Sequence, residues 1–252
     1  MTRTDNKIVL EVCVDSVESA MAAEKGGADR VELCDNLVEG GTTPSSGAIA
    51  LAREKLSLGL HVIIRPRGGD FLYSGVEFEV MKRDIGVAKQ NGADGVVIGI
   101  LSPDGTIDRA RTSELTRLAR PMSVTFHRAF DMTRDPFEAL ETLIEIGVDR
   151  ILTSGQEATA ERGAKLIGEL VERASGRITI MACGEIREAN VRSIIRKTGV
   201  REIHATGFVA CESGMTFRNP RVYMGGEDLD AEYTRKVTDA ATIAALRGAA
   251  EE

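Results

Sequence analysis

The sequence predicts an α/β protein with one domain, a (β/α)8 TIM barrel followed by a C-terminal extension and a helix. Four segments repeat one pattern, a glycine followed about two residues later by a β-rich run, at 27–34, 92–99, 147–154 and 199–206. Strand-like runs at 9–14, 60–65, 122–128 and 178–183 lie before and between them. Strands and helical segments that alternate eight times over 252 residues favour a closed barrel, with a doubly wound sheet as the alternative.

Local signals place the elements in order. Asp15-Ser16-Val17-Glu18 resembles a capping box that opens the first helix, and Asp135-Pro136 offers an N-cap and a first-turn proline for a helix through Glu145. In each repeat a helix is expected to end at the glycine, which tolerates a left-handed cap. A last helix is expected near 238–249. No Pro/Gly/Ser-rich linker divides the chain, so residues 1–252 are expected to form one domain, with the barrel at about 7–210 and the tail at about 211–252.

Composition limits the partners. The net charge of −7 argues against nonspecific binding to nucleic acid or to an anionic membrane surface. No apolar run approaches the roughly 20 residues that span a bilayer. The cysteines, Cys13, Cys34, Cys183 and Cys211, lie far apart in the chain. We therefore expect free thiols in a reducing, cytoplasmic setting, and neither nucleic acid nor a membrane as a partner.

Strand parity predicts what faces the barrel interior. Side chains alternate along a strand, and the apolar Val12 and Leu33 suit the helix side, which leaves their neighbours inside. Active sites of this fold lie at the C-terminal ends of the strands. The residues expected there are Cys13, Cys34, Arg65, His127, Ser154, Cys183 and Thr206, with Glu11, Glu32 and His204 directly beneath them on the first, second and eighth strands.

Several long motifs in these segments resemble one known family. They lie at 10–20, 26–34, 39–45, 64–71 and 125–132, and they are extended by 152–156 and 202–204. Together they resemble the CutC copper homeostasis family over nearly the whole chain. The resemblance implies a cytoplasmic TIM barrel, a homodimer, and copper handling with binding of Cu(I).

Two segments depart from that resemblance. The loop after the seventh strand reads Ala182-Cys183-Gly184-Glu185, with one glycine where the family has a glycine-rich run. The segment after the eighth strand, 204–208, ends in Phe208 rather than in a basic residue. These two loops commonly hold phosphate in this fold, so a phosphorylated ligand is less expected here.

Cys13 and Cys34 are the expected metal ligands. Parity places them at equal heights on adjacent strands, about 4.8 Å apart. Soft thiolates select Cu(I), and the family resemblance points to the same two cysteines. Two other interpretations stay open, because buried cysteines also serve as small core residues and neighbouring strand ends also permit a disulfide.

The alternative function is an enzyme, a lyase or isomerase that acts on a small anionic molecule. Glu11 or Glu32 would act as the base and His204 or His127 as the acid, since carboxylates and imidazoles with mutually perturbed pKa values serve acid–base catalysis. The expected substrate-binding residues are Arg65, Arg67 and Ser154. The competing interpretation is an internal salt-bridge network in which Arg65 neutralises Glu32. A scaffold barrel whose function lies in its dimer surface is a third possibility.

Overall fold

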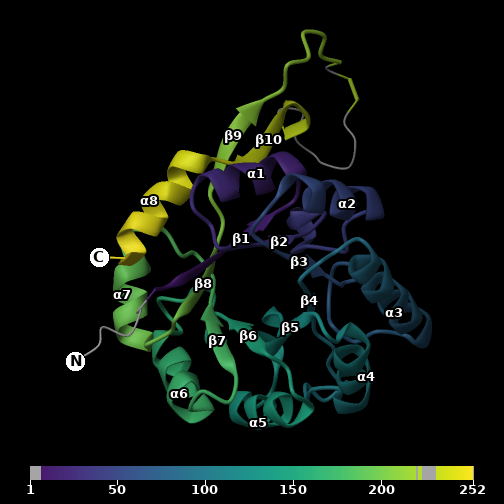
Figure 1. Ribbon diagram of the computed structural model, residues 1–252, viewed down its shortest axis with the longest axis vertical. Coiled ribbons are helices and arrows are strands. Elements are labelled where there is room, and N and C mark those ends of the chain that lie inside the picture. The colour runs from purple at the N-terminus through teal and green to yellow at the C-terminus, as the bar shows by residue number, and fades with distance from the viewer. Residues whose placement is uncertain (1–6, 220, 223–230, 252) are drawn as a thin grey trace.

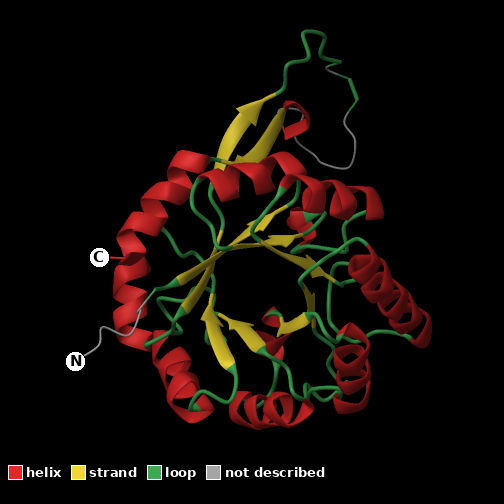
Figure 2. Ribbon diagram, viewed as in Figure 1, coloured by secondary structure: helices red, strands yellow, loops and turns green. Residues whose placement is uncertain are grey.

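A computed structural model describes residues 7–219, 221–222 and 231–251. Strands β1 to β8 form a closed parallel barrel in sequential order, and helices α1 to α8 surround it (Figures 1 and 2). The strands are β1 (Val9–Val14), β2 (Arg30–Leu33), β3 (Gly59–Ile63), β4 (Gly95–Ile98), β5 (Ser123–Phe126), β6 (Arg150–Thr153), β7 (Thr179–Ala182) and β8 (Glu202–Ala205). The helices are α1 (Val17–Lys25), α2 (Ser46–Lys55), α3 (Gly75–Gln90), α4 (Arg109–Ala119), α5 (Pro136–Ile146), α6 (Ala164–Ala174), α7 (Glu188–Thr198) and α8 (Ala240–Glu251). The predicted barrel is confirmed.

The repeated glycines turn the chain from each helix into the next strand. Gly27, Gly92, Gly147 and Gly199 have φ values of 89°, 79°, 84° and 70°, the left-handed region that glycine adopts without strain. The expected N-cap of α5 is confirmed, since Asp135 accepts hydrogen bonds from the two backbone N–H groups that follow Pro136. The expected capping box at 15–18 is wrong, because Ser16 itself caps α1 by accepting from the N–H of Ser19.

The aspartate two residues after the repeat glycine has a structural role that the sequence pattern alone does not indicate. In three repeats it accepts a hydrogen bond from the backbone of the preceding strand and also pairs with an arginine. The strand donors are the N–H groups of Leu10 to Asp29, Leu60 to Asp94 and Val124 to Asp149, and the arginines are Arg247, Arg53 and Arg120, respectively. Each repeat is thereby fixed to its neighbour at the lower rim of the barrel.

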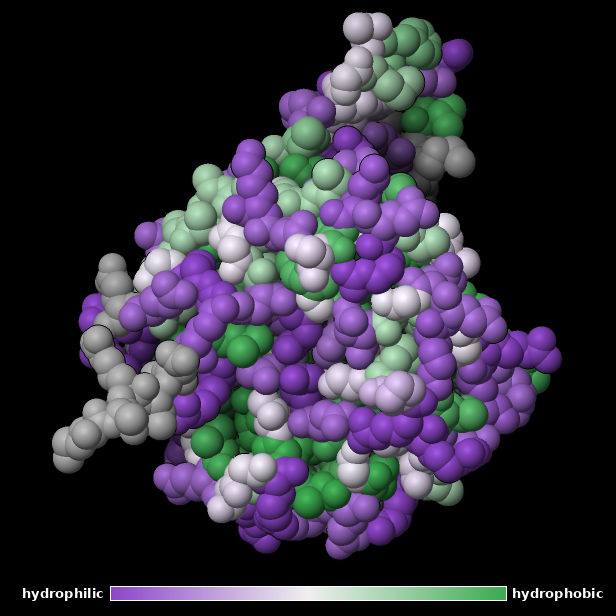
Figure 3. Space-filling view, viewed as in Figure 1, coloured by the Kyte–Doolittle hydropathy of each residue, from purple (hydrophilic) through white to green (hydrophobic). Residues whose placement is uncertain are grey.

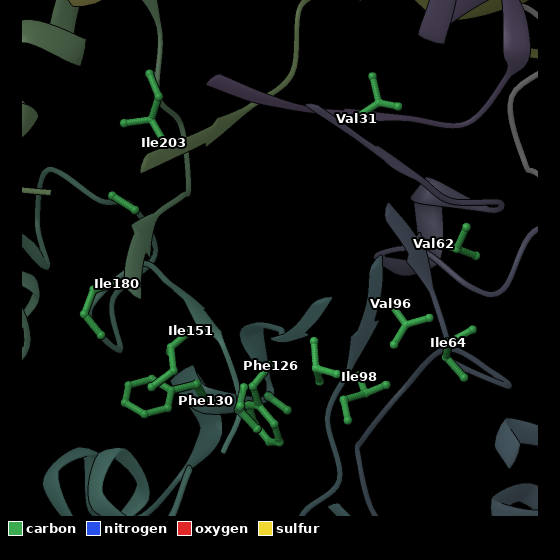
Figure 4. Packing of buried hydrophobic residues seen from close by; sticks show 14 of the residues in the cluster. Val31, Val62, Ile64, Val96, Ile98, Phe126, Phe130, Ile151, Ile180 and Ile203 are labelled. Atoms are coloured by element: carbon green, nitrogen blue, oxygen red, sulfur yellow. The ribbon is translucent and has the colours of Figure 1, made fainter. Parts of the chain in front are cut away.

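The hydrophobic core lies between the strands and the helices. The outward side chains of the barrel strands, among them Val31, Val62, Ile151 and Ile203, form this layer, and Phe130 joins it from the short helix after β5 (Figure 4). All five side chains are fully buried. Burying each such side chain contributes about 1.5–3 kcal/mol, so this layer is the main source of stability. The side chains at the alternate positions of the strands point into the barrel, where they can be polar.

The tail contains more structure than we expected. Strands β9 (Phe208–Glu212) and β10 (Thr234–Thr238) pair in an antiparallel ribbon that projects beside α1 (Figures 1 and 2). This ribbon is not predicted above, although 234–238 contains three β-branched residues. The last helix begins at Ala240 instead of at 238, and it lies in the ring between α7 and α1. Hydrophilic residues cover most of the face in Figure 3.

The barrel register corrects one expectation about the cysteines. Cys13 on β1 pairs with Glu32 on β2, so Cys13 and Cys34 are not register partners at equal heights. In a sheared barrel each strand is offset along its neighbour, and Cys13 therefore lies between Glu32 and Cys34. The sulfur atom of Cys13 can approach both side chains.

Candidate functional site

An ion-pair network fills the lower interior of the barrel. Arg30 pairs with Glu11 and also with Glu202, at 2.7 Å, and Arg150 contacts the same Glu202 at 2.5 Å. Burial would raise the pKa of Glu11, but Arg30 and His204 outweigh burial and hold it well below its usual range. The network therefore presents an ionised Glu11 to the residues above it. The competing interpretation, in which Arg65 neutralises Glu32, is wrong in both residues, because the buried pair joins Arg30 to Glu11 and Arg65 donates to backbone oxygens.

His204 connects this network to the cavity above. Its Nδ1 lies 2.8 Å from Glu11 Oε1, and its Nε2 lies 3.6 Å from Glu32 Oε2. Burial would lower the pKa of His204, but the contacts with Cys13 and Glu11 raise it well above its usual range. His204 is therefore an imidazolium between two carboxyl groups and the sulfur atom of Cys13.

The two glutamates have different charge states. Burial, reinforced by the negative charge of Cys13, raises the pKa of Glu32 well above its usual range, so Glu32 is protonated where Glu11 is ionised. Both side chains are almost completely buried. The difference follows from position, because Glu11 pairs with Arg30 whereas Glu32 lies beside Cys13.

The two cysteines are in contact despite their offset. Cys13 Sγ and Cys34 Sγ lie 3.7 Å apart and both residues are buried. The hydrogen bond from Cys34 and the adjacent His204 lower the pKa of Cys13 to about 6, against the effect of burial. Donation to Cys13, together with burial, raises the pKa of Cys34 well above its usual range. The pair is one thiolate and one thiol near neutral pH.

A cavity of about 350 Å³ opens above these groups at the C-terminal ends of the strands. Its lining residues are Cys13, Glu32, Cys34, Gly40, Ile63, Arg65, Phe71, His127, Arg128, Asp131, Met132, Leu152 and His204. Cys13 Sγ, a Glu32 oxygen and a His204 nitrogen lie within 4.8 Å of one another, a set that could hold a metal ion. With Cys34 beside Cys13, the donors include two soft sulfur ligands.

The other predicted site residues lie apart from this cavity lining. Arg67 is bound to Glu77 at 2.6 Å and to Asp70 at 3.1 Å, on the outer side of its loop. Ser154 is buried, and its hydroxyl, which has one proton to donate, lies 2.9 Å from Asp131 Oδ2 and 2.5 Å from the carbonyl oxygen of Glu157. Their predicted roles in substrate binding remain predictions.

A second cavity, of about 720 Å³, adjoins the first and shares His204 and Arg128 with it. Residues from the loops after β7 and β8, the two segments that differ from the family pattern, line this cavity, including Cys183, Glu185, Thr206 and Phe208. Glu185 places a carboxylate there, in ion pair with Arg187. The residues in which these loops differ from the family pattern therefore line a cavity at the mouth of the barrel.

The lower charged layer was not among the predicted site residues. Arg30, Arg150 and Glu202 occupy the same position of the repeat, two residues before Glu32, Leu152 and His204, so parity already places them inside. Gly95 holds this position in the remaining repeat, and a Cβ there would lie 2.4 Å from His61 Nε2. His61 is buried, with its Nδ1 3.6 Å from Glu11 Oε2.

Comparison with known proteins gives one consistent result. A model described as the CutC family matches residues 8–209. A Homo sapiens protein named copper homeostasis protein cutC homolog is 50% identical over 246 residues, which cover 98% of this chain and 90% of that protein. The family protein CutC of Chromobacterium violaceum is 50% identical, with 97% and 98% covered.

Solved structures agree in fold. A CutC structure from Streptococcus agalactiae superposes with a TM-score of 0.75 at 36% identity, and covers 79% of this chain and 98% of its own. A thiamine phosphate pyrophosphorylase from Pyrococcus furiosus reaches a TM-score of 0.58 at 20% identity, with 98% and 96% covered, and shares the fold alone.

Proposed function

The chain belongs to the CutC family of copper homeostasis proteins, and from that premise we propose that it binds Cu(I) through Cys13 and Cys34. The supporting observation is the contact between the two sulfur atoms, 3.7 Å apart at the floor of a cavity. One of the two is a thiolate near neutral pH, because its pKa is about 6. Thiolates are the protein ligands that Cu(I) prefers.

The spacing of the sulfur atoms indicates the geometry. With metal–sulfur bonds of about 2.3 Å, as in zinc thiolates, a linear S–metal–S arrangement needs sulfur atoms about 4.6 Å apart. At 3.7 Å the angle is about 107°, which leaves room for a third ligand. His204 and Glu32 are the neighbours that could supply it. Binding would displace the proton of Cys34, because the ligand form of cysteine is the thiolate.

An anaerobic titration with Cu(I) against a competing chromogenic chelator tests this proposal. We expect the wild type to bind about one ion per chain, and Cys13→Ser and Cys34→Ser each to lose at least about tenfold in affinity, or about 1.4 kcal/mol. Cys183→Ser is the matched control, a buried thiol outside this pair. Equal affinity in all four proteins would contradict the proposal.

The buried acid–base set favours a second candidate, an enzyme acting on a small anionic substrate. Glu32 and His204 both line the cavity, whereas Glu11 contacts His204 from below. A protonated carboxyl beside an imidazolium can donate protons, a pairing that a thiolate copper site does not require. Substrate profiling of the copper-free protein with Glu32→Gln tests this candidate. Equal turnover in wild type and variant would remove Glu32 from the reaction.

We further propose that the protein works in the cytoplasm as a homodimer. The described cysteines are all free thiols, which suits a reducing compartment. Among the described residues no helix has the length and apolar character of a membrane span. Light scattering of the purified protein tests the dimer, and a monomeric mass at all concentrations would contradict it.

A further inference from the structure

Arg65 is a buried cation without a carboxylate partner in the part of the chain that is described. Its side chain donates to three backbone oxygens, those of Glu39 at 2.7 Å, Gly41 at 2.8 Å and Gly69 at 2.7 Å. Its Nε–H has no hydrogen-bond partner among the described residues. Only 5% of the residue is exposed. A buried charge is costly unless an opposite charge compensates it.

His127 has a free donor of the same kind. Its Nδ1 accepts a hydrogen bond from the backbone N–H of Ala129, 3.1 Å away. Burial and the nearby Arg65 lower the pKa of His127 to about 3, so the ring is neutral and carries its proton on Nε2. That Nε2–H has no partner among the described residues. Gly99 makes room for the ring, since a Cβ there would lie 2.3 Å from it.

The other charges of the cavity are already compensated. Arg128 pairs with Asp131 at 2.8 Å. His204 is held between Glu11 and the Cys13 thiolate, and Glu32 is protonated. Arg65 therefore leaves one positive charge at the cavity without a counter-charge.

We propose that Arg65 and His127 form a subsite for the carboxylate group of a small organic acid, which their free Nε–H and Nε2–H bind. Two N–H donors suit the two oxygens of a planar carboxylate. The apolar side chains of Ile63, Met132 and Leu152 line the same cavity and would cover the body of the ligand. A volume of about 350 Å³ restricts the ligand to a small molecule.

Phe71 controls access to this subsite. Its ring centroid lies 5.0 Å from that of His127, and the Arg65 guanidinium carbon lies 5.2 Å from the ring centroid. Both free nitrogens are shielded from solvent. A carboxylate reaches them when this packing relaxes, and Phe71 is the side chain that contacts both. The subsite does not depend on copper, because neither donor belongs to the proposed thiolate pair.

The design of the test variant follows from the two nitrogens of His127. His127→Asn keeps an acceptor for the N–H of Ala129, since asparagine is a favoured N-cap, but removes the Nε2–H donor. Arg65→Lys is the second variant, which keeps the charge and loses the Nε–H. Arg117→Gln removes an exposed charge on α4 and is the control.

Calorimetric titration of the copper-free, full-length protein with L-lactate, lactamide and inorganic phosphate tests the proposal. We expect L-lactate to bind, lactamide to bind at least about tenfold more weakly, and both subsite variants to lose at least about tenfold in L-lactate affinity. Arg117→Gln should bind as the wild type does. Absence of L-lactate binding at millimolar concentration, equal binding by the variants, or preference for phosphate would each overturn the proposal. The Cu(I) affinity of His127→Asn should stay unchanged, which separates this result from the fate of the copper proposal.

Discussion

Glu11 and Glu32 have the same side chain and are both buried, yet one is ionised and the other neutral, because their neighbours differ. Glu11 faces Arg30, whereas Glu32 faces the Cys13 thiolate. Glu11→Gln leaves part of a buried ion pair unmatched, and we expect a loss of about 3 kcal/mol in the free energy of unfolding near neutral pH. Glu32→Gln resembles the protonated acid already present, and we expect a change below about 1 kcal/mol. Urea denaturation measures both.

The pH dependence of these two variants should differ in sign. Glu11 has a folded pKa below the ordinary 4.5, so its stabilisation is present above that pH and is lost as the pH falls. Glu32 has a raised pKa, so the wild type loses stability as the pH rises above 4.5 toward that value. Glu32→Gln lacks this loss and should gain on the wild type with rising pH. Parallel curves for both variants would contradict the assigned charge states.

The ionisation of Cys13 gives a second prediction at this scale. Because the pKa of Cys13 is about 6, labelling by iodoacetamide should reach half its maximal rate near that pH. His204→Gln removes a positive neighbour and should move the midpoint to higher pH. Peptide mass spectrometry of the labelled protein gives the rate at Cys13 alone. A wild-type midpoint near 9, the ordinary value for a thiol, would contradict the prediction.

At the scale of elements, the sequence predicts strands and their inner faces but not how the strands are offset. The repeat locates β2, β4, β6 and β8, and parity places Glu11, Glu32 and His204 inside. Register is a property of the closed barrel, set by its shear, and no single strand encodes it. For this reason the prediction that Cys13 and Cys34 lie at equal heights is wrong. The free donor on His127 also depends on the loop that follows β5, which brings Ala129 N–H to the ring.

Glycines on two elements allow a matched test of interior packing. Gly95 on β4 faces His61, and Gly95→Ala would place a Cβ 2.4 Å from that ring. We expect a loss of about 1–3 kcal/mol in the free energy of unfolding. Gly86 on α3 has no described atom from outside its own helix turn within 4 Å of its Cβ position, and Gly86→Ala should gain about 0.5–1 kcal/mol in the free energy of unfolding. Denaturant titration measures the free energy of unfolding of both variants, and equal values would contradict the packing described here.

For the whole molecule, the candidate site exists only when the barrel closes. Glu11 and Cys13 come from β1, Glu32 from β2 and His204 from β8, so the first and last strands must pair to bring them together. The same closure depends on α8, which packs between α7 and α1. Function at the mouth is thereby coupled to contacts between the two ends of the chain.

Arg247 is the residue of α8 through which this coupling can be tested. Its guanidinium donates to the carbonyls of Ile8, at 2.6 Å, and Gly27, at 3.2 Å, and it pairs with Asp29. Only 12% of its side chain is exposed, so Arg247→Met should lower the free energy of unfolding by about 2 kcal/mol. Arg109→Met removes an arginine that pairs with Glu145 on the surface and should cost less than about 1 kcal/mol. Urea denaturation of the two variants gives the comparison. Equal stabilities would mean that α8 packs against the barrel without holding its two ends together.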